Sequence, residues 1–314
     1  MENIEKLYNI SFNVEYHKKY GDVILDIFDN DNLNYDLTDK NILNIIGLYY
    51  ECKITNYNEM KKYYLMAIKL NDCRAMYSLG YYYQFTEKNY DKMKKYYLMA
   101  IELNNSESMN KLGFYYQSIE KNYDEMKKYY LMAIKLNNSN AMVGLAFYYK
   151  NIEKNYDEMK KYYFMAIELN NSNAMNNLGC YYKNIERNYD EMKKYLLMSI
   201  ELKNNYAIGN LGYYYQYDEK NYDEMKKYHL MAIKLNNNFS MDNLNKHYDK
   251  YMQHFLLRQI NSTIAIKKVK ELEENNFLGI KIFKELTEYC FNPQRLLKLC
   301  NIYGIELNEY MDII

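Results

Sequence analysis

NYDEMKKYYLMAI, residues 122–134, is the third of six near copies of one stretch in this 314-residue chain. Every copy carries a methionine at the same place, and these residues are Met60, Met93, Met126, Met159, Met192 and Met225. Successive methionines are 33 residues apart, without a single insertion. A fixed period of this size is typical of stacked helical repeats, in which neighbouring units share one continuous core.

The repeated stretch itself predicts a helix, which we call the second helix of each unit. In the fifth copy, Asn188 is a good N-cap, and Glu191 three residues later completes a capping-box pattern. The expected buried stripe of this helix is Met192, Tyr195, Ser199 and Leu202. The small residue in this stripe, Ser199 here and Ala in the other copies, permits close approach of a neighbouring helix.

A shorter helix, the first helix of each unit, is predicted before the second one. In the fifth copy, the residues spaced as one helical stripe are Met175, Leu178, Gly179 and Tyr182. The polar turn Lys203-Asn204-Asn205 then separates one unit from the next. Each unit is therefore expected to hold two antiparallel helices, neither of which can bury its stripe alone.

The run AIELNNSNAMNNLG, residues 166–179, resembles the Sel1-like repeat, in which an Ala-rich helix end, a polar turn and an Ala-x-x-x-Leu-Gly helix start recur. Residues 189–192 resemble the related tetratricopeptide pattern. Two features depart from the family: the Gly-rich insertion between the helices is missing, and Ala146 and Asn245 replace the Gly. Ankyrin repeats share the period, but their Thr-Pro-Leu-His turn is absent from a chain with one Pro.

We predict an all-α protein, an α-solenoid of six two-helix units that winds into a right-handed superhelix between helical caps. Residues 1–37 are interpreted as an N-terminal cap, because residues 23–28 are apolar enough to pack on the first repeat. The repeat array is assigned to residues 38–255. Residues 256–314 are interpreted as a helical C-terminal cap, with Asn292-Pro293 starting one of its helices.

Composition excludes several function classes. Lys+Arg and Asp+Glu are both 41, so no global charge recruits nucleic acid or an acidic membrane. The start lacks the pattern of a signal peptide, and no apolar run approaches a membrane span. Five scattered cysteines indicate reduced thiols, so we expect a cytoplasmic protein. The richness in Asn, Tyr and Lys is similar to repeat proteins of amoeba-infecting giant viruses, which implies the host cytoplasm.

The resemblance implies a non-enzymatic scaffold for protein–protein interaction, which binds a peptide or protein in a concave groove lined by the first helices. Carried onto this chain, the contact positions of the related tetratricopeptide family form three rows whose residues differ between copies. The first row is Leu48, Tyr81, Phe114, Phe147, Cys180 and Tyr213. The second row is Asn44, Tyr77, Asn110, Val143, Asn176 and Gly209. The third row is Glu51, Gln84, Gln117, Lys150, Lys183 and Gln216.

Aromatic rings beside amides offer flat apolar contact together with donors and acceptors for a peptide backbone. Variation between copies is expected for a ligand-facing row, and equally for a row that faces solvent. The first row, which adjoins the Gly contact, could instead be packing between repeats. The residues that are identical in every copy are interpreted as the stack itself.

Paired lysines on the second helices supply the alternative function, a nucleic-acid binder that follows a phosphate backbone. These pairs run from Lys61-Lys62 to Lys226-Lys227 at the repeat period. Asp124 and Glu125 lie four and three residues before Lys128, so a neutralised, solvated face is the expectation we favour.

Catalysis, cofactors and metals are not predicted. His247, His254, Cys290 and Cys300 lack the close spacing of a zinc-ligand pair. The ten glycines form no phosphate-binding loop. We therefore expect no enzyme activity, no cofactor and no metal.

Overall fold

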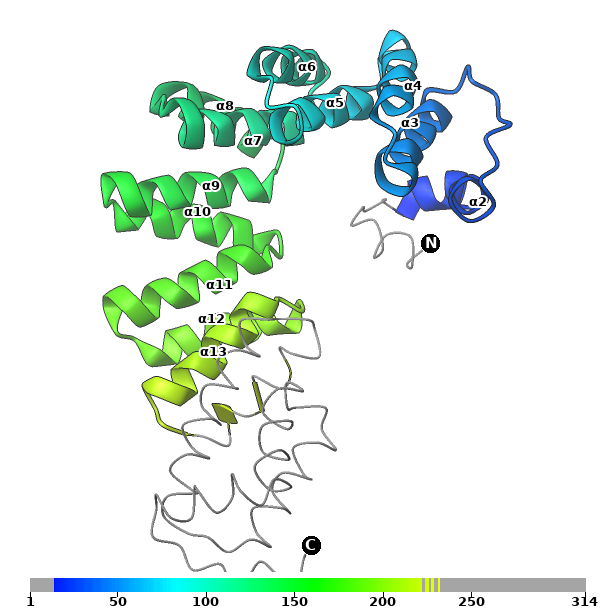
Figure 1. The fold of residues 1–314 in the computed structure, drawn as a ribbon. Coiled ribbons are helices and arrows are strands. Elements are labelled where there is room, and N and C mark those ends of the chain that lie inside the picture. The colour runs from blue at the N-terminus through cyan, green and yellow to red at the C-terminus, as the bar shows by residue number, and fades with distance from the viewer. Residues whose placement is uncertain (1–13, 222–223, 226, 229–230, 232–314) are drawn as a thin grey trace, which may run out of the picture. The chain divides into compact units, whose positions relative to one another are not determined.

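The computed structural model describes residues 14–221, 224–225, 227–228 and 231 (Figure 1). Within these residues the chain is helical, and no strand occurs. The chain divides into two compact units, residues 1–169 and 170–314, which are described separately. The predicted C-terminal cap and the zinc-like group of His and Cys residues lie outside the described residues.

The first compact unit contains an N-terminal helix followed by four helix pairs (Figure 1). Its helices are α2 (Val14–Asn30), α3 (Lys40–Tyr49), α4 (Tyr57–Lys69), α5 (Cys73–Phe85), α6 (Tyr90–Glu102), α7 (Ser106–Tyr115), α8 (Tyr123–Lys135), α9 (Ser139–Tyr148) and α10 (Tyr156–Glu168). In the second unit the described helices are α11 (Ser172–Tyr181), α12 (Tyr189–Glu201) and α13 (Asn205–Tyr217). Each first helix packs along the second helix that follows it. This arrangement confirms the predicted all-α solenoid of two-helix units, while the hand of its superhelix stays a prediction.

The N-caps of the second helices are confirmed, but the capping box is used only in part. The Asn188 side chain accepts a hydrogen bond from the backbone N–H of Glu191, and Asn122 does the same for Glu125. The backbone N–H of Asn188, however, donates to the Tyr182 carbonyl at 3.0 Å. The Glu191 carboxylate is therefore not needed at the cap, and it pairs with Lys194 instead.

A single turn of π-helix extends four of the first helices, which the sequence analysis did not predict. These turns cover Tyr50–Ile54, Tyr116–Glu120, Tyr149–Glu153 and Tyr182–Glu186. Each ends at a residue in the left-handed conformation, such as Lys121 with φ 56°. Tyr116, the first residue of its turn, lies in a parallel stack with Tyr129 of the next helix, with ring centroids 5.6 Å apart. Tyr83 of α5 makes the same stack with Tyr96 without a π-helical turn. The connection between the helices is therefore built from ring stacking as well as from polar residues.

The core repeats with the sequence. Met126 and Ala133 of α8 are fully buried, and Leu112 of α7 packs in the same interior. The predicted stripe of α12 is correct for Met192, Tyr195 and Ser199 but wrong for Leu202, which is 43% exposed. Leu202 lies beyond the last residue of α12, where the backbone leaves helical geometry and the side chain no longer follows the buried stripe.

The helix α2 covers one side of α3. Ile24 and Ile27 are fully buried against Ile45 and Ile46 of α3. Open apolar faces at the end of a repeat array need such a cover. The domain boundaries at residues 37 and 255 stay predictions.

A glycine in each first helix makes room for a tyrosine of the second helix. A Cβ atom on Gly113 would lie 2.7 Å from Cδ1 of the Tyr130 ring, and the same contact recurs at Gly80 with Tyr97. A real Cβ atom essentially never comes this close, so the ring must shift. Ala146 stands at this position in the fourth copy, which shows that one repeat accommodates the methyl group.

We predict that Gly113→Ala destabilises the protein by about 1–3 kcal/mol, because the methyl group overpacks a filled core. The matched control is Gly21→Ala in α2, where an added Cβ atom meets nothing within 4 Å. That substitution should stabilise the helix by about 0.5–1 kcal/mol, because alanine is the better helix former. Thermal unfolding followed by circular dichroism measures both; a Gly113→Ala variant that melts at or above the wild-type temperature contradicts the packing account.

Candidate functional site

The first row is exposed on the first helices. Tyr81 of α5, Phe114 of α7 and Phe147 of α9 are 39%, 46% and 52% exposed. Leu48 of α3 is half-buried. In the second compact unit, Tyr213 is exposed and Cys180 is half-buried. The aromatic members of this row therefore contribute little to the core, although their exposure alone does not assign them a ligand.

An aromatic pair with a cation above it includes the Tyr81 member of this row. The rings of Tyr81 and Phe85 have centroids 4.5 Å apart, and Lys111 Nζ of α7 lies 5.3 Å and 5.9 Å from them. Burial lowers the pKa of the Lys111 ammonium. Sequence reasoning missed Phe85 and Lys111, because neither position carries a similar residue in the neighbouring copies.

The second row is mostly half-buried. Asn44, Tyr77, Asn110 and Val143 are each partly exposed, while Asn176 and Gly209 of the second compact unit are buried. Tyr77 lies against Tyr97, with ring centroids 6.0 Å apart, and burial raises the pKa of its hydroxyl. The second row is therefore less exposed than the aromatic residues of the first row, and Tyr77 packs partly in the interior.

The third row holds the buried tyrosines of the second helices. The hydroxyls of Tyr64, Tyr97 and Tyr130 are the donors in three equivalent hydrogen bonds. Their acceptors are Glu51 Oε2 at 2.6 Å, Gln84 Oε1 at 2.8 Å and Gln117 Oε1 at 2.8 Å. Lys150 is half-buried, and Lys183 pairs with Asp218 at 2.8 Å.

Burial separates members of this row from a possible ligand. Gln84 and Gln216 are 6% and 7% exposed, so they offer little surface to a partner. The sequence held the signal for the structural role: an acceptor residue precedes a tyrosine by 13 residues in three copies, as Gln84 precedes Tyr97. We therefore treat the third row as support for the second helix and the first row as the candidate contact surface.

The lysines of these pairs are neutralised in two different ways. The second lysine of a pair bonds to the Glu three residues before it, as Lys128 does with Glu125 at 2.9 Å; Lys95 is the exception, since Lys92 stands at that place. Of the two acidic residues that the sequence analysis placed near Lys128, Glu125 is the one that pairs with it. The first lysine bonds to the next unit, as Lys127 does with Glu153 at 2.6 Å. These partners leave the nucleic-acid alternative without support.

The described residues give no support to other site types. They contain no group of three or more His, Cys, Asp or Glu side chains placed to hold a metal ion. Among the described helices, none has the length and apolar character that crossing a membrane requires. The expected absence of enzyme activity and of a cofactor stays a prediction.

Comparison with solved structures places this fold among Sel1 repeats. A Sel1 repeat protein from Oxalobacter formigenes is similar with a TM-score of 0.56 and 20% identity, over 71% of this chain and 100% of that chain. A protective antigen of uropathogenic Escherichia coli with an SLR fold gives a TM-score of 0.49 at 20% identity, over 68% of this chain and 50% of that chain. An immunity protein from Pseudomonas aeruginosa gives 0.45 at 20% identity, over 57% and 74%.

No protein-family model matches the sequence, and no match was found among curated proteins. The likeness to the Oxalobacter formigenes protein confirms, at the level of the fold, the resemblance to Sel1-like repeats seen in the sequence.

Glu51 gives the third row a pH-dependent contribution to stability. Burial raises the pKa of the Glu51 carboxyl above its ordinary value of 4.5, and the hydrogen bond from Tyr64 only partly opposes this. The folded chain therefore holds this proton more tightly than the unfolded chain. Stability from this group is fully present below pH 4.5 and is lost as the pH rises through the folded-state pKa.

We predict that Glu51→Gln stabilises the protein at pH 7 by about 0.5–1.5 kcal/mol, because a neutral amide accepts the same hydrogen bond without burying a charge. The gain should shrink toward zero as the pH falls to the ordinary pKa of the carboxyl. Gln117→Glu should create the opposite loss at the equivalent place. Melting temperatures measured between pH 4 and pH 8 test this, and a difference independent of pH would show that the charge is not responsible.

Proposed function

We propose that this protein is a non-enzymatic scaffold that binds an extended segment of a protein partner along its first helices. The observation that supports it most is the exposed aromatic row Tyr81, Phe114 and Phe147, which repeats on α5, α7 and α9 while the buried stack beneath it stays constant. Large rings at a surface give contact area at a small cost in side-chain entropy, and such residues dominate protein interfaces.

The amides of the second row complete this surface. Asn44 and Asn110 lie on α3 and α7, partly exposed, one helical turn before the first row. Asn44 Nδ2 has no hydrogen-bond partner within the described residues. This atom is itself buried, so Asn44 contributes to the surface through the partly exposed remainder of its side chain. Rings flanked by amides fit an extended peptide better than a small molecule.

The partner is thus proposed as a protein or peptide. The cytoplasmic location, and the host cytoplasm for a viral protein, remain predictions from the sequence. The lysines of the second helices are engaged by Glu side chains, as in Lys61 with Glu87 at 3.0 Å, so they do not extend the proposed surface.

We predict that Phe114→Ala with Phe147→Ala lowers binding to the partner at least ten-fold while melting temperature and helical content stay nearly unchanged, because both rings lie outside the core. A random peptide library displayed on phage supplies a defined probe. The wild-type chain should enrich a shared peptide motif, and the double variant should not.

The matched control truncates two exposed side chains of the second helices, Leu98→Ala with Leu131→Ala. This control removes similar apolar surface from the other helix of each unit, so it should enrich the same motif as the wild-type chain. Equal enrichment by the phenylalanine variant, or its unfolding, would contradict the proposed surface.

A further inference from the structure

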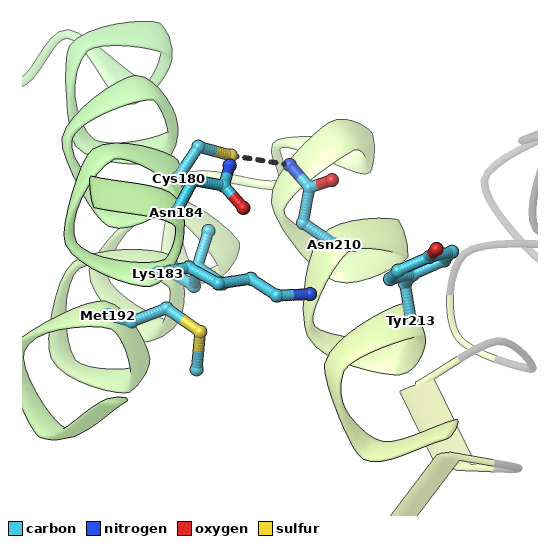
Figure 2. Close-up of a pocket in the computed structure, with 7 residues that line it drawn as sticks. Cys180, Lys183, Asn184, Met192, Asn210 and Tyr213 are labelled. Atoms are coloured by element: carbon cyan, nitrogen blue, oxygen red, sulfur yellow. Dashed lines mark hydrogen bonds between the residues drawn. The ribbon is translucent and has the colours of Figure 1, made fainter. Parts of the chain in front are cut away.

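A cavity of about 250 Å³ opens between α11, α12 and α13 in the second compact unit (Figure 2). Its lining includes Cys180, Lys183, Met192, Leu196, Asn210 and Tyr213. The lining combines apolar side chains with the polar ends of a lysine and an asparagine. The volume is below the roughly 300–1,000 Å³ of sites that hold drug-sized ligands, so it fits a single side chain.

The other repeats show what this space holds when it is filled. Position 196 of the fifth copy is Leu, whereas the four preceding copies have Tyr64, Tyr97, Tyr130 and Tyr163. Tyr97 donates its hydroxyl to Gln84, and Lys183 is the residue equivalent to Gln84. A Cβ atom on Gly144 would lie 2.6 Å from Cζ of Tyr130, and Asn210 is the residue equivalent to Gly144.

The tip of a tyrosine ring therefore lies, in those copies, between the residues that correspond to Lys183 and Asn210. In the fifth copy, Leu196 fills only the inner part of this space. A Cβ atom on Gly179 would lie 2.9 Å from Leu196 Cγ, just as the tyrosine rings approach the glycines of the other copies. Among the described residues that line the cavity, none replaces the outer half of the ring and its hydroxyl.

A second replacement by a small residue widens the same space. Cys180 stands where Tyr81, Phe114 and Phe147 stand in the three preceding copies. Two neighbouring aromatic positions are thus reduced in size in one repeat, and the cavity lies where both are reduced. The atoms that line a void in a packed protein lack dispersion contacts on one side. A group that fills the void restores these contacts.

The polar groups are held in place around the opening. Lys183 Nζ pairs with Asp218 at 2.8 Å and lies 4.7 Å from the centroid of the Tyr213 ring. Asn210 Nδ2 donates to Asn176 Oδ1 at 2.8 Å and to Cys180 Sγ at 3.2 Å. Figure 2 shows the Lys183 chain extending across the space toward α13, with Asn210 above it. An ammonium group so placed can donate to an oxygen atom that enters the cavity.

We propose that this cavity binds a tyrosine side chain of the partner, which replaces the ring that the fifth repeat lacks. The ring would lie against Met192 and Leu196, and its hydroxyl oxygen would accept a hydrogen bond from Lys183 Nζ. The inference rests on the proposed function only in that a protein partner carries the tyrosine. The cavity itself can be tested with 4-methylphenol, the free form of that side chain, so its test needs no partner.

The decisive variant is Leu196→Tyr, which restores the residue of the other repeats. Its matched control is Leu197→Tyr, the same change at the next residue of α12, which is exposed. Saturation-transfer NMR measures 4-methylphenol binding to the full chain. We expect millimolar binding to the wild-type chain and to Leu197→Tyr, and binding at least ten-fold weaker to Leu196→Tyr. Equal binding to both variants, or no binding to the wild-type chain, overturns the proposal.

Toluene, which has the same ring and methyl group without the hydroxyl, tests the role of the polar opening. One hydrogen bond corresponds to a loss of about two- to ten-fold in affinity. Toluene that binds as tightly as 4-methylphenol overturns the assignment of a tyrosine. If 4-methylphenol binding fails while the wild-type chain still enriches a phage-displayed motif, the proposed function stands and only the cavity assignment is lost.

Discussion

The first three repeats depend on one contact, the buried second-helix tyrosine that lies over the glycine of the first helix. Tyr97 is fully buried, its ring occupies the space left by the missing side chain of Gly80, and its hydroxyl reaches Gln84. The contact joins the two helices of a unit through apolar burial and a hydrogen bond together. Because the ring fills the space over the glycine, a slide of either helix would leave a void or an unsatisfied polar group.

This contact explains why the constant residues and the proposed contact surface lie on different helices. The second helices are fixed by what they bury, and most of the lysines in their Lys pairs bond to Glu side chains within or between repeats, as Lys127 does with Glu153. Each first helix of the first compact unit from α5 on packs against the second helices before and after it, and the residues that differ between copies lie on its remaining, exposed face. Phe114 and Phe147 lie on that side. Where the constant contact itself changes, at Leu196, the result is a cavity rather than a collapsed repeat.

Much of the fold could be predicted from the sequence, because the period and the N-cap asparagines are local signals. Asn188 caps its helix as expected. The π-helical turns could not be predicted, because the same tyrosine stack also forms without one: Tyr83 stacks on Tyr96 at the end of α5, which is α-helical throughout. The burial of Gln84 was missed for a related reason: an amide that bonds to a buried hydroxyl has the same local pattern as an amide that faces solvent.

An alanine scan across α7 and α8, with peptide binding and thermal stability measured for every variant, tests the separation of these roles most directly. The account predicts that binding is lost without loss of stability at Phe114 of α7. It predicts the reverse at Met126, with stability lost by about 2–5 kcal/mol because a buried side chain is removed. Binding and stability lost together at the same positions would contradict it.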